Sequence, residues 1–412
     1  MKPVVVVGAG AAGLAAALRL AQGGCAVQVL DGAAGATSLS CGALDVTPWE
    51  DGDVGEGVDG DALRLLEGLG LYRVARMLVA TTSGILRAAG GADRALLDVK
   101  ALPRGTVLVP RTDHPAWDGN ALARAWSDAD VARARGLAFA AVDATILRYR
   151  DERVLCDADI AARHDDAARL EWLAERLREA LARSGRCVGV ILPPWLGVEG
   201  PQAEALSARV GLPCGEAVSA LASAAGRRFE RAQERALTRA GVVSRRGWVR
   251  RVAVGSPWTV ELEDGDAIEA SAVVLATGGL VGGGLAYDPS EADVAGEVPG
   301  QARPMFRMGL EAPGVLGAGG RPLELPGSLF GVPPESIAWP FAKDPLMDRV
   351  GLLVDAACGV QGAPGGLLAC GDLVADRPRT WLEAWRSGVR AGSALSERLL
   401  GRENVDLHDA RG

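Results

Sequence analysis

The sequence predicts an α/β fold in which a Rossmann-like nucleotide-binding domain with a parallel sheet is interrupted by an inserted α+β cap domain. Three observations support this prediction. A strand, a glycine-rich turn and a helix follow one another over residues 4–21. A second apolar strand over residues 270–276 ends in glycines, and a third strand over residues 367–371 precedes the last helical segment, residues 380–400.

The first of these segments is a β-α-β unit. Residues 4–8 form a continuous apolar run, as expected for a strand buried on both faces of a parallel sheet. Residues 11–21 have helix-forming composition, and a second apolar run over residues 26–30 ends at Asp31. A unit of this kind is the usual framework of a dinucleotide site.

The turn between the first strand and the helix has the sequence Gly8-Ala9-Gly10-Ala11-Ala12-Gly13. Gly8 allows a tight turn, Gly10 allows the backbone to approach a pyrophosphate, and Gly13 allows the helix and strand to pack closely. The free N–H groups of the helix, with Ala12 among the first residues, favour phosphates. Asp31 lies where an acid can bind a ribose hydroxyl. The sequence therefore predicts dinucleotide binding.

The middle of the chain predicts a cap built of mixed elements. Residues 32–49 are expected to form an ordered loop. Helical patterns cover residues 62–90, 121–136, 161–183, 203–209 and 229–240, and strands are expected at residues 96–111, 138–149 and 188–192. Residues 242–254 and 258–263 predict a hairpin, and residues 304–348 are expected to be irregular.

These elements predict a discontinuous domain organisation. The nucleotide-binding domain is assigned to residues 1–60, 261–300 and 351–412. The cap takes residues 61–190, residues 191–260 are linking strands and helices that belong partly to the cap, and residues 301–350 are a cap or interface segment.

Two further turns indicate which nucleotide is bound. The strand that ends in Ala276-Thr277-Gly278-Gly279 resembles the second fingerprint of two-segment FAD-binding flavoproteins of the fumarate reductase and succinate dehydrogenase kind. Ala369-Cys370-Gly371-Asp372 resembles their C-terminal flavin segment. In such proteins the acidic residue contacts the ribityl or phosphate region, and the following helix directs its N-terminus at the isoalloxazine ring. The resemblance implies that Thr277, Gly278, Gly279, Gly371 and Asp372 contact the flavin nucleotide.

The resemblance extends to one family, the B subunits of the anaerobic glycerol-3-phosphate dehydrogenases. It is carried by the serine-rich loop over residues 37–45, by Pro193-Pro194-Trp195-Leu196-Gly197, and by residues 105–110 and 278–284. It implies that Ser38, Ser40 and Gly42 also face the cofactor. It also implies a flavoprotein that works with a catalytic FAD subunit and an iron–sulfur subunit, oxidising the small molecule sn-glycerol 3-phosphate to dihydroxyacetone phosphate and passing electrons to quinone.

The cofactor is expected to be FAD, with FMN as the alternative. Asp31 and the complete first fingerprint favour the adenine-containing form, and non-covalent attachment is expected because no histidine is placed for a covalent bond. Two other functions remain open: a non-catalytic subunit that relays electrons or scaffolds a complex, and a fumarate-reductase-like dehydrogenase of another substrate.

Catalytic residues cannot be assigned from the sequence, although two candidates stand out. Histidine is the usual base in alcohol oxidation at neutral pH, and the chain has three. We expect His164 and His408 at the surface. His114, in a loop after Arg111, is the candidate base, and Arg111 is a candidate phosphate ligand. Trp195 is expected in the core.

The composition narrows the remaining classes. A net charge of −8 argues against a nucleic-acid partner. Seven scattered cysteines without C-x-x-C spacing predict neither a metal site nor an iron–sulfur cluster. Without an apolar stretch of about 20 residues, we expect a cytoplasmic protein that meets the inner membrane only through partner subunits.

Overall fold

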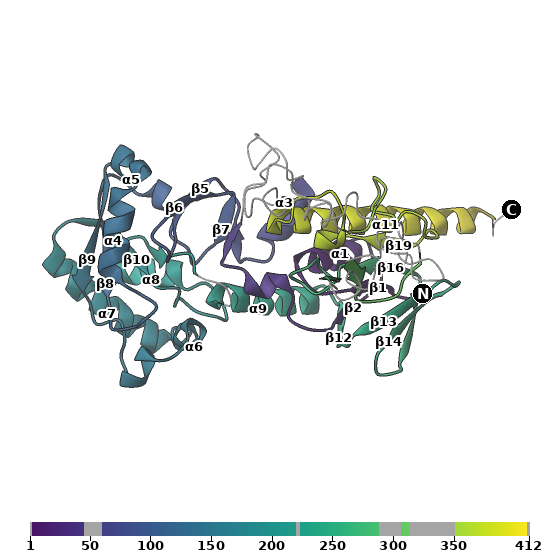
Figure 1. Ribbon diagram of the computed structural model, residues 1–412, viewed down its shortest axis with the longest axis horizontal. Helices are drawn as coiled ribbons and strands as arrows, with labels where there is room; N and C mark the ends of the chain where they lie inside the picture. The colour runs from purple at the N-terminus through teal and green to yellow at the C-terminus, as the bar shows by residue number, and fades with distance from the viewer. Residues whose placement is uncertain (1, 45–59, 220–222, 288–305, 314–350, 410–412) are drawn as a thin grey trace, which may run out of the picture. The chain divides into compact units, whose positions relative to one another are not determined.

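The computed structural model describes residues 2–44, 60–219, 223–287, 306–313 and 351–409 (Figure 1). The chain divides into two compact units. Unit 1 comprises Met1–Thr37, Thr47–Trp49 and Ala236–Gly412, and unit 2 comprises Ser38–Val46 and Glu50–Arg235. The finer division into six segments stays a prediction.

Unit 1 is built on a five-stranded parallel sheet, which confirms the predicted parallel sheet and adds the strand β12 to it. Its order is β12-β2-β1-β16-β19, with bounds β1 Val4–Val7, β2 Val27–Asp31, β12 Val243–Arg246, β16 Ala272–Leu275 and β19 Leu367–Ala369. Val7 pairs in register with Leu30 on one side and Leu275 on the other, and Leu275 pairs with Ala369. Four neighbouring strands therefore end at the same level.

Two helices of unit 1 pack closely against each other. The helices α1 (Ala11–Gln22) and α11 (Trp381–Asp409) lie side by side (Figure 1). A Cβ atom on Gly388 would overlap the carbonyl oxygen of Ala12, and one on Gly392 would lie 2.9 Å from the carbonyl oxygen of Ala16. The small residues thus allow α11 to approach the backbone of α1.

The remaining strands of unit 1 form two antiparallel groups. One contains β13 (Val249–Ala253), β14 (Trp258–Leu262) and β15 (Ala267–Ala270), and the other pairs β17 (Leu285–Tyr287) with β18 (Phe306–Met308). The predicted hairpin is confirmed only for β13 and β14. The prediction of one strand over residues 242–254 is wrong, because its first part forms β12 and pairs with β2. The prediction of an irregular region over residues 304–348 is wrong at Phe306–Met308, which pair with β17, and its residues 304–305 and 314–348 lie outside the described residues.

Unit 2 contains a second parallel sheet, in the order β11-β10-β8-β9. The strands are β8 (Gly105–Arg111), β9 (Leu137–Asp143), β10 (Cys187–Leu192) and β11 (Cys214–Glu216). Helix α4 packs on β8 and β9 (Figure 1). The helices of this region are α4 Gly119–Asp128, α5 Asp130–Arg135, α6 Asp157–Arg163, α7 Ala167–Ser184, α8 Ala203–Val210 and α9 Ala224–Arg239. Helix α9 begins in unit 2 and ends in unit 1.

Short antiparallel strands complete unit 2. They are β3 Ala43–Leu44 before helix α3 (Gly60–Glu67), and β4 Tyr72–Arg73, β5 Met77–Ala80, β6 Leu86–Ala89 and β7 Gly91–Asp93 after it. Two 3-10 turns follow at Val99–Ala101 (η2) and Arg150–Arg153 (η3), and a third, Ala36–Leu39 (η1), begins in unit 1 and ends in unit 2. The helix predicted over residues 62–90 is therefore wrong beyond Glu67. Gly70, with φ of 71°, leads the chain out of the helical region into these strands. Within the described residues, no helix is both long and apolar enough to cross a membrane.

Candidate functional site

The site begins where the order of the unit 1 strands reverses. From β1 the chain passes through α1 to β2 on one side, whereas β16 and β19 lie on the other side of β1. In open α/β sheets, ligands bind outside the carboxyl ends of the strands at such a switch point. Gly8 and Ala276 directly follow the paired strand ends Val7 and Leu275 and flank this position.

In the first glycine-rich turn, Gly8 and Gly13 lie against protein backbone, whereas Gly10 does not. Gly8 has a φ of 107°, and a Cβ there would overlap the carbonyl oxygen of Ala276. A Cβ on Gly13 would overlap the carbonyl oxygen of Gly8. At Gly10, in contrast, the one atom among the described residues that a Cβ would meet is Thr37 Oγ1, at 3.2 Å. A side chain at Gly10 would therefore press on the end of a side chain, whereas one at Gly8 or Gly13 would overlap backbone.

The beginning of α1 suits an anion. Gly10 is its N-cap and makes no side-chain capping bond. The amide of Ala11 donates to Thr37 Oγ1 at 3.1 Å, and no acidic residue lies in the first turn of the helix. The helix dipole and the first-turn amides that follow Ala11 can bind phosphate at such an end.

The second turn, Thr277-Gly278-Gly279, follows β16 and reaches the third. A Cβ on Gly279 would lie 2.7 Å from the carbonyl oxygen of Asp372. The Thr277 hydroxyl oxygen is buried and has no hydrogen-bond partner among the described residues. Because buried hydroxyls are normally paired, this atom fits a site whose ligand supplies a polar partner.

The third turn joins β19 to α11. Gly371 has a φ of 74°, and a Cβ there would lie 2.8 Å from the Cβ of Ala12. Its amide donates to Ser387 Oγ on α11 at 2.8 Å. The Glu383 amide donates to Thr380 Oγ1 at 3.2 Å, so α11 begins where the sequence predicts. The three turns thus touch one another: the first contacts the second at Gly8, the second contacts the third at Gly279, and the third contacts α1 at Gly371.

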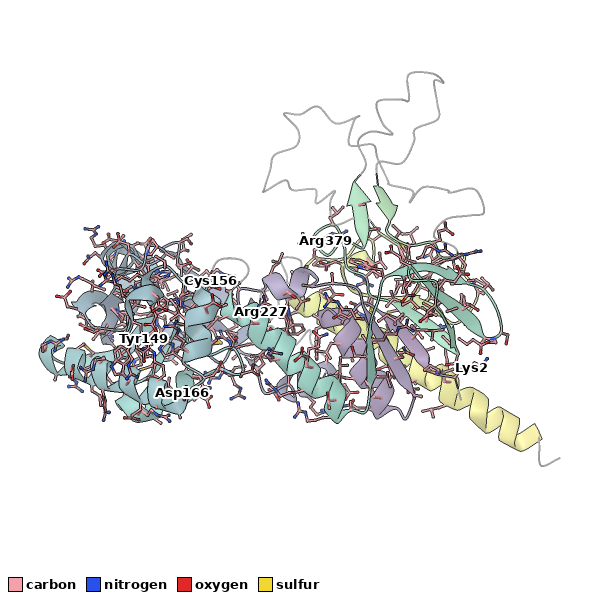
Figure 2. All side chains as sticks on the ribbon, turned by 90° about the horizontal axis from the view of Figure 1, so that it is seen from below. Lys2, Tyr149, Cys156, Asp166, Arg227 and Arg379 are labelled. Atoms are coloured by element: carbon pink, nitrogen blue, oxygen red, sulfur yellow. The ribbon has the colours of Figure 1, made fainter. Side chains whose placement is uncertain are left out.

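Arg379 is a residue of this region that the sequence analysis did not select. Its Nη1 donates to the carbonyl oxygen of Asp372, and the same atom lies against the Cα of Gly279 (Arg379 is labelled in Figure 2). It therefore places a positive charge beside the second and third turns. The sequence contains a signal for this residue: residues 373–379 separate Asp372 from the last helical segment, and Arg379 is the last of them.

Asp31 lies at the end of β2, beside β1, in the position that its spacing predicts. Its carbonyl oxygen accepts a hydrogen bond from the amide of Gly247 at 3.0 Å. Along the carboxyl edge of the sheet, the predicted residues therefore follow the order Asp31, the Gly8–Gly13 turn, Thr277–Gly279 and Gly371–Asp372.

Ser38, Ser40 and Gly42 belong to unit 2, where they pack near the start of α9. A Cβ on Gly226 would overlap the carbonyl oxygen of Ser38, and Ser223 Oγ donates to the carbonyl oxygen of Ser40 at 3.4 Å. The Gly42 amide donates to Ser40 Oγ at 3.2 Å. These contacts fix the loop within its own unit, and its predicted contact with the cofactor stays a prediction.

The two catalytic candidates lie in unit 2, Arg111 at the end of β8 and His114 in the loop that follows. His114 is buried: its Nε2 lies 2.9 Å from the carbonyl oxygen of Leu155, and the amide of Ala116 donates to its Nδ1 at 3.3 Å. Both ring nitrogens are thus engaged within the protein. Arg111 pairs with Asp143 at 3.0 Å and, with His114, lines a cavity of about 240 Å³. Their catalytic roles stay predictions.

The expectation that His164 lies at the surface is wrong. Its exposed fraction is 1%, and its Nδ1 lies 2.8 Å from the carbonyl oxygen of Trp195. Burial, followed by the charge of Arg169, lowers the pKa of His164 to about 4. His164 lies at the C-terminal end of helix α6, where the segment that follows β10 and contains Trp195 covers the imidazole ring. Trp195 lies in the core as expected, and its indole N–H donates to Asp157 at 2.7 Å. The side chain of His408 lies outside the described residues.

A buried ionic cluster explains the Pro-Pro-Trp-Leu-Gly motif. Arg228 on α9 donates from Nε to Asp93 Oδ2 and from Nη2 to Glu216 Oε2, each at 2.6 Å. Its Nη1 donates to the carbonyl oxygen of Gly197 at 2.6 Å, and the Leu196 amide donates to Glu216. Burial raises the pKa of Glu216, and Arg228 opposes this shift. These contacts fix the backbone of Leu196 and Gly197, so the residues of the cluster position the motif.

Among the described residues, no group of three or more histidine, cysteine or acidic side chains lies close enough together to hold a metal ion.

Comparisons with known proteins find similar solved structures at low identity. No family model matches the chain. No curated protein matches it either. The chain is similar to a thioredoxin reductase from Gloeobacter violaceus, with 13% identity, 97% of this chain and 95% of that chain covered, and a TM-score of 0.32.

Two other solved structures show a similar degree of likeness. The GidA-related protein from Thermus thermophilus is 12% identical, with 96% of this chain and 99% of that chain covered and a TM-score of 0.33. The peptidyl tryptophan dihydroxylase QhpG is 17% identical, with 68% of this chain covered and a TM-score of 0.24. The chain spans about a third of QhpG, since 33% of that protein is covered. Identities and scores this low transfer no function.

Proposed function

We propose that the chain is an FAD-dependent oxidoreductase whose cofactor lies across the carboxyl edge of the unit 1 sheet. The observation that carries this proposal is the meeting of three turns, from residues 8–13, 277–279 and 371–372, at a topological switch point. FAD is the ligand that uses all of them. A nicotinamide dinucleotide would engage the first turn and leave the other two without a role.

The order of residues along the edge gives the cofactor a direction. Asp31 would bind the adenosine ribose, and the backbone at Gly10 with the start of α1 would take the diphosphate. Thr277 and Asp372 would then face the ribityl chain, with Thr277 Oγ1 finding its partner there. The residues of unit 1 that would hold FAD, without a covalent bond, are Gly8, Gly10, Ala12, Gly13, Asp31, Thr277, Gly278, Gly279, Gly371 and Asp372; the contacts predicted for Ser38, Ser40 and Gly42 stay predictions.

The flavin end of this site holds an arginine and a helix N-terminus. Arg379 lies beside Gly279 and Asp372, and α11 begins one residue after Thr380. Positive charge and a helix N-terminus stabilise the extra electron density of a reduced flavin. When bound, the flavin supplies the redox chemistry, accepting a hydride equivalent and releasing single electrons. The protein contributes binding, orientation and this electrostatic setting.

The finer proposal is the B subunit of an anaerobic glycerol-3-phosphate dehydrogenase. The serine-rich loop over residues 37–45 and the Pro193–Gly197 motif support it by resemblance. In that role the chain would act with a catalytic FAD subunit and an iron–sulfur subunit, and would reach the membrane through them. His114 and Arg111 are then the candidates for contact with the small-molecule substrate.

One observation favours a second function, an electron-transfer or scaffold flavoprotein without its own substrate chemistry. The two described histidines are buried, and His114 uses both ring nitrogens in internal contacts. A base that must release its partners before it can act is poorly prepared for proton abstraction.

A spectrum of the purified chain tests the cofactor, and anaerobic reduction tests the substrate. We expect flavin absorption bands and, on mass analysis of the released cofactor, FAD; released FMN would correct the cofactor. Bleaching of the visible band by sn-glycerol 3-phosphate supports the dehydrogenase, whereas bleaching only after a partner subunit is added supports the relay function. A colourless protein that fails to take up FAD would contradict the whole proposal.

A further inference from the structure

A tryptophan lies exposed beside the adenosine end of the proposed site. Trp248 follows β12 and is 56% exposed, although tryptophan is usually largely buried. In unit 1, Arg246 of β12 is in register with Asp31 of β2, so the chain reaches Trp248 just beyond the carboxyl end of β2. The indole therefore lies at the edge of the sheet where the three turns also lie.

The position of the indole is fixed by its neighbours. A Cβ on Gly32 would lie 2.9 Å from both Cδ2 and Cε3 of Trp248, so the ring packs directly on the Cα of Gly32. The amide of Gly247 donates to the carbonyl oxygen of Asp31 at 3.0 Å, and the amide of Glu263 donates to the carbonyl oxygen of Trp248 at 2.9 Å. Hydrogen bonds before and at the tryptophan thus anchor its backbone while much of the side chain stays open.

We propose that Trp248 is the residue on which the adenine of the cofactor stacks, and that it makes the site selective for an adenine dinucleotide over a flavin mononucleotide. This inference rests on the proposed function. If the diphosphate lies at Gly10 and the ribose at Asp31, the base must lie beyond Asp31, and the next residue, Gly32, carries the indole. An exposed aromatic face held at that point is suited to stack with a purine.

The proposal gives a measurable loss of affinity. Stacking of a base on an aromatic side chain is worth about 1–3 kcal/mol by truncation, which corresponds to a Kd roughly 5- to 150-fold weaker. We therefore expect Trp248→Leu to weaken the binding of FAD and of ADP by about the same factor, because both contain the adenine. Trp248→Phe should retain part of the affinity, because a smaller aromatic face remains.

The test is a calorimetric titration of the full-length apoprotein with FAD and, separately, with ADP. Tyr149→Leu is the matched control, because Tyr149 is also an exposed aromatic residue, 51% exposed, but belongs to unit 2. It should leave both affinities unchanged. Quenching of tryptophan fluorescence by ADP should also be smaller in Trp248→Phe than in the wild type.

Two outcomes separate the inference from the proposed function. If the wild type binds FAD and ADP, and Trp248→Leu binds both with unchanged affinity, the stacking role is wrong and the flavin site stands. If the wild type binds neither ligand, the proposed function and the stacking role are both wrong.

Discussion

Replacing Arg228 by methionine should destabilise the protein strongly, because it leaves two buried carboxylates without their cation. The side chains of Arg228, Asp93 and Glu216 are almost completely inaccessible to solvent. Removing one partner of such a pair costs about 3–5 kcal/mol. The variant also loses the hydrogen bond to the carbonyl oxygen of Gly197. We expect a loss at the upper end of that range in urea denaturation at pH 7, followed by circular dichroism.

The neighbouring arginine provides the control. Arg227 lies one residue earlier on α9, is labelled in Figure 2, and makes an exposed ion pair with Glu230 at 3.0 Å. Such surface pairs contribute about 0–1 kcal/mol, so Arg227→Met should cost less than about 1 kcal/mol. If the two methionine variants have equal stability, the buried cluster does not hold the fold as described.

The loss should also depend on pH in a defined direction. Burial raises the pKa of Glu216, and the charge of Arg228 acts against this shift. Without Arg228, the folded-state pKa of Glu216 rises further above its unfolded value, and the folded variant then binds a proton that the unfolded chain releases. Its stability therefore falls as the pH rises through this interval. The deficit of Arg228→Met should be smaller at pH 5 than at pH 8, and Glu216→Gln should relieve part of it at pH 8.

Three more variants test the first turn, the buried histidine and the helix packing. Gly10→Ala should change the stability of the apoprotein by less than about 1 kcal/mol, because φ is −65° there. The same variant should bind FAD roughly 10- to 100-fold more weakly, because the added methyl group crowds charge-assisted hydrogen bonds to the diphosphate. If calorimetry gives the same affinity for the variant and the wild type, the diphosphate does not lie at this turn. The pKa of His164 is lowered from 6.5 to about 4, which corresponds to about 3 kcal/mol of stability that is lost as the pH falls through that interval. The urea midpoint of His164→Gln should therefore depend less on pH than that of the wild type. An unchanged pH dependence would contradict the lowered pKa of His164. Gly388→Ala should lower the melting temperature because its Cβ overlaps Ala12, whereas Gly401→Ala, in open space on the same helix, should not; equal melting temperatures would contradict the close packing of the two helices.

The parallel sheet of unit 1 could be predicted because its signals are local. The strands β1, β16 and β19 are buried throughout and therefore appear as unbroken apolar runs. The glycines that end them mark the turns. The edge strand β12 is mostly exposed, so it has no apolar run, and its residues were predicted to be part of the hairpin that follows.

Other features depend on contacts that sequence patterns do not record. The strands β4–β7 of unit 2 are two to four residues long, too short for alternation to outweigh a helical pattern. Arg228 meets Asp93 across 135 residues of chain, and an arginine in a charged helix normally indicates a solvated face. Burial of His164 likewise follows from its packing against the segment after β10.

The surroundings of the fingerprint glycines show two different reasons why a position carries glycine. At Gly8, Gly13 and Gly371, a Cβ would meet atoms of the protein itself, so these positions would require glycine whether or not a ligand is bound. Gly10 differs, because its backbone conformation suits any residue and a Cβ there would meet, among the described residues, one side-chain atom, Thr37 Oγ1 at 3.2 Å, and no backbone. Protein packing therefore disfavours a side chain less at Gly10 than at the other positions, whereas a diphosphate approaching the start of α1 would require glycine there. The reason for assigning a ligand to this turn therefore lies in Gly10, and the other glycines show only how the turns are brought together around it.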